Sequence, residues 1–220
     1  MSVIGSALPF FFGASKSSGP AIGSSFGGGF FAGYISHTAN GVATHALIVA
    51  PAATGATGQD YTLTTNKQWK TANTTTAGTN STYDGAANSA NMNNASHPAA
   101  EFCEGLSIGG YTDWYLPARD ELEIAYYNLK PTTTSNSTLW GINAYSVPAR
   151  GSNYTAGTPA QTTVTAFQTG NSVAFVAAYH WSSTEDSSTT AWRLTFSNGP
   201  QASTTKDNNN RVRAFRKLAL

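Results

Sequence analysis

The chain has 220 residues, only 10% of them charged, and its formal net charge is +1. Because a typical globular chain carries about 25% charged residues, we expect uncharged Thr, Ser and Asn side chains to cover most of this surface. The near-zero net charge excludes a broad basic surface for nucleic acid or anionic lipid. Hydrophobic residues make up 40% of the chain, which excludes a disordered chain of low hydrophobicity.

The single cysteine, Cys103, excludes an internal disulfide and therefore a disulfide-stapled secreted domain. The four histidines are scattered, and no CxxC or HExxH pattern occurs, so we expect no zinc site. An apolar run at residues 6–12 is interrupted by Pro9 and has no basic residue before it. We therefore expect neither a cleavable signal peptide nor a membrane span.

The first part of the chain changes character near residue 27. Residues 1–26 are rich in Gly, Ser and Phe and lack acidic residues, which predicts either a flexible tail or a docking arm that orders against a partner. Two short buried strands are then expected at residues 29–35 and 46–50, with Asn40-Gly41 in the turn between them.

The middle of the chain combines a polar tract with two helices. Residues 52–95 have little apolar periodicity, and we expect Trp69 and Tyr83 to anchor them to the core. One helix is expected at residues 97–107, with Ser96 as its N-cap. A second is expected at residues 117–129, where Pro and two acidic residues suit the first turn.

The last third of the chain is expected to form strands. Their predicted ranges are 172–178, 179–183, 191–196 and 211–217. Helices early in the chain and strands late in it indicate an α+β domain.

Two groups of residues could carry enzyme chemistry. Asp120 and Glu123 lie on one face of a predicted helix, as paired catalytic carboxylates would, but acidic residues are also favoured in a first helical turn. His180, Ser182 and Glu185 place an imidazole, a hydroxyl and a carboxylate close in sequence, but no GxSxG motif frames them. We therefore expect the protein not to be an enzyme.

Calcium is the one metal for which the sequence offers ligands. Glu185, Asp186 and residues 207–210 carry side-chain oxygens of the kind that calcium takes, but they lack EF-hand spacing. We therefore expect no cofactor, and calcium stays open. Trp181, Trp192, Tyr154 and Tyr179 are interleaved with Ser, Thr, Asn and Gln, a mixture that suits sugar faces and adaptable protein surfaces. We expect Trp114, Trp181 and Trp192 to be core residues and the polar residues around them to make the contacts.

A resemblance to a known family rests on residues 110–122. Their sequence, GYTDWYLPARDEL, is similar to the GYSDWYLPSxDEL segment of a lectin-like domain family found in bacterial collagen-like adhesins and in phage tail or fibre proteins. Further similar pieces follow in the family's order, at residues 27–31, 180–185, 191–199 and 210–216. The resemblance covers residues 27–220 and leaves residues 1–26 as a separate N-terminal docking arm.

The resemblance implies a C-type-lectin-like fold, which is an α+β domain with a small twisted antiparallel sheet, two helices and long loops. Trp114 and Leu116 would enter the core, and the last strand would close the sheet beside the first. The calcium-binding EPN and WND triplets of animal C-type lectins are absent, so calcium-dependent sugar binding is not implied. The catalytic cysteine pair of the formylglycine-generating enzymes, which share a related fold, is also absent.

In related lectin-fold binders, including the variable proteins of diversity-generating retroelements, the C-terminal strand pair and its loops form the binding face. The resemblance therefore implies a ligand-binding face of polar side chains near the C-terminus. These are Ser182, Glu185, Ser187, Arg193, Ser197, Gln201, Ser203, Thr205, Asp207, Asn208 and Asn209. The implied ligand is a glycan or protein of a bacterial surface.

Together these features predict a non-enzymatic bacteriophage virion protein of the tail or fibre type, which attaches the particle to a host receptor. The arm would dock to other virion proteins, and the fibre-like assembly favours a homotrimer. One alternative is a purely structural capsid or tail decoration or fibre protein that binds no receptor. Another is an adhesin on a bacterial cell surface, and an enzyme of the same fold is the least favoured.

Overall fold

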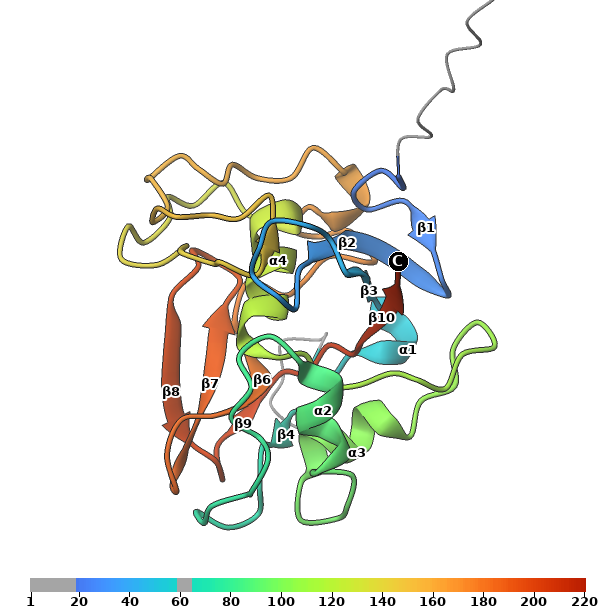
Figure 1. Cartoon of the computed structure of the whole chain (residues 1–220), viewed down its shortest axis with the longest axis vertical. Helices are drawn as coiled ribbons and strands as arrows, with labels where there is room; N and C mark the ends of the chain where they lie inside the picture. Colours follow the sequence, from blue (N-terminus) through green and yellow to red (C-terminus); the bar gives the residue numbers. More distant parts are fainter. Residues whose placement is uncertain (1–18, 59–64) are drawn as a thin grey trace, which may run out of the picture.

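The computed structural model describes residues 19–58 and 65–220 (Figure 1). Within these residues the chain forms small antiparallel sheets, α-helices and long loops, which confirms the predicted α+β class. Most of the predicted docking arm, residues 1–18, lies outside the described residues.

The largest sheet joins the two ends of the described chain. It contains β1 (Ser25–Phe26), β2 (Gly29–Ile35), β3 (His45–Val49) and β10 (Phe215–Ala219) in that order, with β5 (Ser146–Val147) also paired to β2. The strands predicted at residues 29–35 and 46–50 are therefore confirmed. The last strand lies beside β3, with Phe215 opposite Val49, and not beside the first strand as predicted. β1 and β5 pair with β2 instead, while β3 separates β2 from β10.

The described end of the predicted arm, residues 19–26, lies on this sheet. The Gly23 N–H donates to the Phe31 carbonyl at 2.8 Å, and Ile22 packs against the core. β1 adds a short strand to the edge of β2. These eight residues are thus held by the domain's own backbone and core.

Two smaller sheets complete the fold. One contains β6 (Tyr179–Glu185), β7 (Thr190–Thr195) and β8 (Gln201–Thr205) in that order, and the other pairs β4 (Lys67–Gln68) with β9 (Asn209–Asn210). The strands predicted at residues 179–183 and 191–196 are confirmed. The strand predicted at residues 211–217 begins only at Phe215, because residues 211–214 make isolated bridges and loop contacts.

Residues 172–178 were predicted as a strand and form turns and irregular backbone instead. The buried guanidinium of Arg213 explains the difference, because its Nη2 donates to the Val173 carbonyl at 3.0 Å. The same guanidinium donates from Nε to the Ala50 carbonyl at 2.6 Å. A side chain therefore takes a carbonyl that a neighbouring strand would otherwise pair with.

The helices are α1 (Ala52–Gly55), α2 (Gly85–Ala90), α3 (Pro98–Glu104) and α4 (Arg119–Leu129), with a 3₁₀ turn at Thr165–Phe167. The two predicted helices correspond to α3 and α4. The N-cap of α3 is His97 and not Ser96. α4 begins two residues after Pro117, where the buried Glu121 carboxylate accepts the Ala118 N–H at 2.8 Å and closes the first turn.

α4 is the central element of the molecule. It packs against β2 on one side and against β6 and β7 on the other (Figure 1). Its apolar face carries Leu122 and Tyr126 into one core cluster. A second cluster contains Trp69, Trp114 and Trp181, each fully buried, so the predicted anchoring role of Trp69 is confirmed.

The burial of three further side chains separates core residues from surface residues. Leu116 is buried just before α4, as the resemblance implied. Cys103 is buried in the second cluster, and burial raises the pKa of its thiol. Trp192 differs from Trp114 and Trp181, because it is only half-buried and faces a groove described below.

The buried His180 makes stability depend on pH. Its ring meets the stacked rings of Phe175 and Phe196 edge to face, and burial lowers its pKa to about 3. The unfolded chain takes up a proton below pH ~6.5, whereas the folded chain does not, so this contribution is lost as the pH falls through that window. We expect the native chain to lose about 2–3 kcal/mol more than His180→Phe between pH 7 and about 4.5. Urea unfolding at both pH values checks this, and an equal loss in both proteins would contradict it.

Candidate ligand-binding surface

The polar residues implied as a binding face spread over both ends of the β6–β7–β8 sheet. β7 and β8 run antiparallel, so the turn after β6 and the turn after β8 meet at one end, and the turn between β7 and β8 lies at the other. The first end carries Glu185, Ser187, Thr205, Asp207, Asn208 and Asn209. The second carries Ser197 and Gln201. The structure therefore does not bring the implied residues together in one surface.

Ser182 and Glu185 are occupied by their own chain. Ser182 is buried, and its hydroxyl donates to the Trp192 carbonyl at 2.9 Å. Glu185 forms an ion pair with the fully buried Lys206 and accepts the Thr76 N–H at 3.0 Å. Both side chains hold the fold together.

The exposed residues at the same end also have local roles. The Ser187 hydroxyl accepts the N–H groups of Thr189 and Thr190 at 3.2 and 3.1 Å, which caps the β6–β7 turn. The Asn208 amide donates to the Thr204 and Thr205 hydroxyls, which orders the turn after β8. Asp207, Asn209 and Ser203 are exposed.

Arg193 lies in the middle of β7 on the face opposite Trp192. Its guanidinium stacks at 3.7 Å over the Tyr179 ring and donates to the Asn210 side chain at 3.3 Å. Because neighbouring residues of a strand point to opposite faces, Arg193 and Trp192 cannot contact one ligand on the same side of the sheet.

The residues considered for catalysis bind different partners. His180 donates from Nδ1 to the Ala178 carbonyl, whereas Ser182 and Glu185 bind the groups named above, so the three do not converge. Asp120 and Glu123 are both buried in α4. No group of three or more His, Cys, Asp or Glu side chains among the described residues could hold a metal ion.

A groove of about 300 Å³ opens beside β8 and brings together residues that are distant in sequence. Its lining residues are Arg119, Leu139, Trp140, Gly141, Ile142, Asn153 and Gln201, and we call it the tryptophan groove. Trp192 adjoins it, because the rings of Trp140 and Trp192 meet edge to face at 6.5 Å. Ser203 is paired with Trp192 across the strands, so it lies on the same face.

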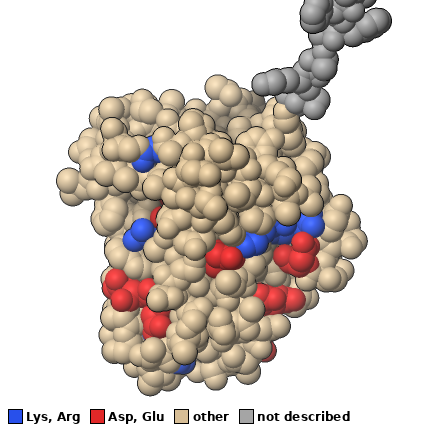
Figure 2. Space-filling view, viewed as in Figure 1, with Lys and Arg blue, Asp and Glu red and all other residues tan. Residues whose placement is uncertain are grey.

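The tryptophan groove is apolar at its rim and electrically neutral at its base. Leu139 is 76% exposed and Ile142 is 61% exposed. The Arg119 guanidinium lies 5.1 Å over the Trp192 ring, and its Nε donates to the Asp120 carboxylate at 3.2 Å. This pairing leaves the groove with fixed N–H donors and little net charge. Figure 2 shows the same low charge on the face it draws, where uncharged residues cover most of the surface.

A buried lysine holds the loop that carries Trp140. Lys130, just after α4, donates to the Thr134 carbonyl at 2.5 Å and to the Asn136 side chain at 2.7 Å. Burial lowers the pKa of Lys130. The Ser137 N–H then donates to the Asn198 carbonyl at 2.9 Å, which fixes the loop to the β7–β8 turn. In Figure 1 the loops after α4, coloured yellow to orange, accordingly gather at that end of the sheet.

Sequence reasoning placed one residue of this groove, Gln201, in the binding face and missed the others. A signal was present at residues 139–142, where Leu-Trp-Gly-Ile stands alone in a tract of Thr, Ser and Asn. Because this run follows neither a helical nor a strand period, it does not predict an element with one side facing the core. Exposed apolar side chains in such a run are candidates for a contact surface.

The long loops and open groove of this α+β fold are consistent with a surface domain of the lectin-like, adhesin type, as the motifs indicated. The chain belongs to the Lcl C-terminal domain family, whose model matches residues 61–216, more than two thirds of the chain. β1, β2 and β3 precede the matched region and share a sheet with β10 near its end. A comparison with curated proteins finds no match. Among the described residues, no helix is long and apolar enough to cross a membrane.

Proposed function

We propose that this chain is a non-enzymatic attachment protein whose lectin-like domain binds a glycan of a bacterial surface in the tryptophan groove. The observation that carries the proposal is the groove itself, where the exposed Leu139 and Ile142 stand beside Trp140 and fixed N–H donors. Aromatic rings with neutral hydrogen-bonding groups suit the apolar faces and hydroxyls of sugars. The low surface charge supports the same ligand class, and the mode needs neither a cofactor nor calcium.

We further propose that the protein acts on a bacteriophage particle, as part of its tail or fibre. The similarity of residues 110–122 to the segment found in phage tail and fibre proteins supports this location. The part of the predicted arm that precedes the folded residues, residues 1–18, would attach the domain to other virion proteins, and a homotrimer would present several grooves to one cell. A purely structural virion protein and a bacterial surface adhesin are the alternatives.

Binding to whole bacteria tests the attachment function. Fluorescently labelled full-length protein is added to a panel of strains, with and without prior periodate oxidation of the cell-surface sugars and with a calcium chelator in a parallel sample. We expect binding to some strains, kept with the chelator and lost after periodate where the sugars of the receptor carry vicinal hydroxyls. Folded protein that binds no strain would overturn the proposal in favour of a structural role, and binding that survives periodate but is lost after protease digestion of the cell surface would exclude a glycan receptor.

Detection of the chain in purified virions tests the location. The proposal expects the chain in intact phage particles, and its loss from particles when residues 1–18 are deleted. Its presence on bacterial envelopes in the absence of phage would instead favour the bacterial adhesin.

A further inference from the structure

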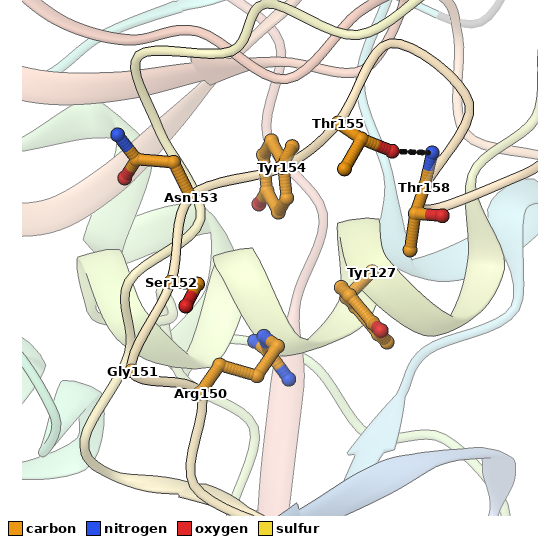
Figure 3. A pocket seen from close by; sticks show the side chains of 8 residues that line it. All are labelled: Tyr127, Arg150, Gly151, Ser152, Asn153, Tyr154, Thr155 and Thr158. Carbon is orange, nitrogen blue, oxygen red and sulfur yellow. Dashed lines mark hydrogen bonds between the residues drawn. The ribbon is translucent and has the colours of Figure 1, made fainter.

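A second pocket adjoins the tryptophan groove on the other side of the loop that carries Asn153. Its volume is about 260 Å³, and we call it the tyrosine pocket. Its lining residues are Tyr127, Arg150, Gly151, Ser152, Asn153, Tyr154, Thr155 and Thr158 (Figure 3). Asn153 lines both cavities. The groove and the pocket are therefore adjacent.

Arg150 sets the chemistry of the tyrosine pocket. Its guanidinium lies 4.2 Å over the Tyr127 ring, and its Nη2 is paired with the fully buried Glu123. Glu123 also accepts hydrogen bonds from the Tyr154 hydroxyl at 2.5 Å and from the Asn143 amide at 2.6 Å. The buried Glu123 carboxylate thus neutralises the charge of Arg150, and the Tyr127 ring fixes the plane of its guanidinium.

The two cavities repeat one arrangement. In the groove Arg119 lies over Trp192 and is paired with Asp120, and in the pocket Arg150 lies over Tyr127 and is paired with Glu123. Asp120 and Glu123 are three residues apart in α4, a spacing that puts them on neighbouring turns of one helix face. One rigid helix therefore fixes both arginines.

The wall between the cavities is free to contact a ligand. Asn153 is exposed, and its side chain makes no hydrogen bond to residues 19–58 or 65–220. In Figure 3 it points away from Tyr127 and Arg150. On the far side of the pocket the Thr158 N–H donates to the Thr155 hydroxyl at 3.0 Å, which closes that wall (Figure 3).

We propose that the tyrosine pocket and the tryptophan groove are adjoining subsites of one extended site for a neutral oligosaccharide that carries N-acetyl groups. This inference rests on the proposed function and names the ligand class of the same surface. The exposed Leu139 and Ile142 suit the methyl of an acetamido group, and the side-chain N–H groups of Gln201 and Arg119 suit its carbonyl oxygen. A linear chain that crosses Asn153 would place its next sugar in the tyrosine pocket.

An acidic or sulfated ligand is disfavoured by the same geometry. Each arginine already has a carboxylate partner, so a ligand anion would compete with Asp120 or Glu123 for it. Binding of a neutral chain should therefore depend only weakly on salt, because exposed unpaired charges are the ones that salt screens.

Titration calorimetry with oligomers of N-acetylglucosamine tests the inference. Full-length protein is titrated with the monomer, chitobiose and chitotriose, and with the unacetylated cellotriose as the control. We expect chitotriose to bind at least about tenfold more tightly than the monomer, and cellotriose to bind weakly or not at all. Equal affinity for monomer and trimer, or for chitotriose and cellotriose, would overturn the inference.

Ser152→Trp separates the two subsites without touching the buried ion pair. Ser152 is exposed on the pocket rim, so an indole there fills the tyrosine pocket and leaves Glu123 and Arg150 in place. We expect the variant to bind chitotriose only as tightly as the monomer, with monomer binding unchanged. Unchanged chitotriose affinity would overturn the extended site. If the native protein binds cells in a periodate-sensitive way but its affinity does not depend on oligomer length, this inference alone is wrong. If the native protein binds no cells, the proposed function is wrong as well.

Discussion

Replacing Trp181 with Ala is expected to lower the free energy of unfolding by about 3–5 kcal/mol. Trp181 is fully buried beside Trp69 and Trp114, and its indole N–H donates to the Lys67 carbonyl at 2.8 Å. The variant loses a large apolar side chain and leaves the partly buried Lys67 carbonyl without this donor. Chemical denaturation followed by circular dichroism measures the change.

Trp140→Ala is the matched control for this prediction. Trp140 is half-buried, lines the tryptophan groove and packs as a partly buried residue against the first core cluster. We expect its replacement to cost about 1–2 kcal/mol, less than that of Trp181, while weakening ligand binding. Equal destabilisation by the two substitutions would contradict the division between core and surface tryptophans.

Lys206→Met is expected to lower the free energy of unfolding by about 3 kcal/mol. The Lys206 ammonium is fully buried, pairs with Glu185, and donates to the Thr74 and Ser188 carbonyls, each at 2.9 Å. Its removal leaves the Glu185 carboxylate without its ion-pair partner and the Ser188 carbonyl without this donor, whereas the Thr74 carbonyl keeps the Lys70 ammonium at 3.1 Å. Thermal unfolding of both proteins at neutral pH checks the prediction.

Lys217→Met provides the control, because Lys217 pairs with Asp84 at a partly exposed site. Exposed pairs contribute about 0–1 kcal/mol, so we expect a small effect. Adding Glu185→Gln to Lys206→Met should recover part of the lost stability, since it removes the unpaired charge. A double variant less stable than Lys206→Met would show that Glu185 does not act through Lys206.

The fold could be predicted where apolar residues follow a regular period. The apolar run at residues 29–35, which forms β2, and the spacing of Leu122, Ala125 and Leu129 in α4 each indicated the correct element. β8 was missed because its sequence, Gln-Ala-Ser-Thr-Thr, is polar and lies at the edge of its sheet. α2 was missed for a related reason, because its buried Asn88 is held by hydrogen bonds to Ser81 and not by apolar contacts.

The candidate site could be predicted only in part, because it depends on how loops fold back. Gln201 was reached through the family resemblance, whereas Trp140 and Asn153 come from loops whose position is set by Lys130 and α4. Glu185 was placed in the binding face because its carboxylate stands in a polar segment. Its partner, Lys206, is 21 residues away, and no local pattern links the two.

Cell binding by two matched double variants tests the central claim most directly. Leu139→Ser/Ile142→Ser alters the rim of the tryptophan groove, whereas Asp207→Ala/Asn208→Ala alters exposed residues at the other end of the sheet. With both proteins shown to be folded, we expect the first to lose binding to strains that the native protein recognises, and the second to keep it. If only Asp207→Ala/Asn208→Ala loses cell binding, the tryptophan groove is not the binding site, and the ligand lies on the turns after β6 and β8.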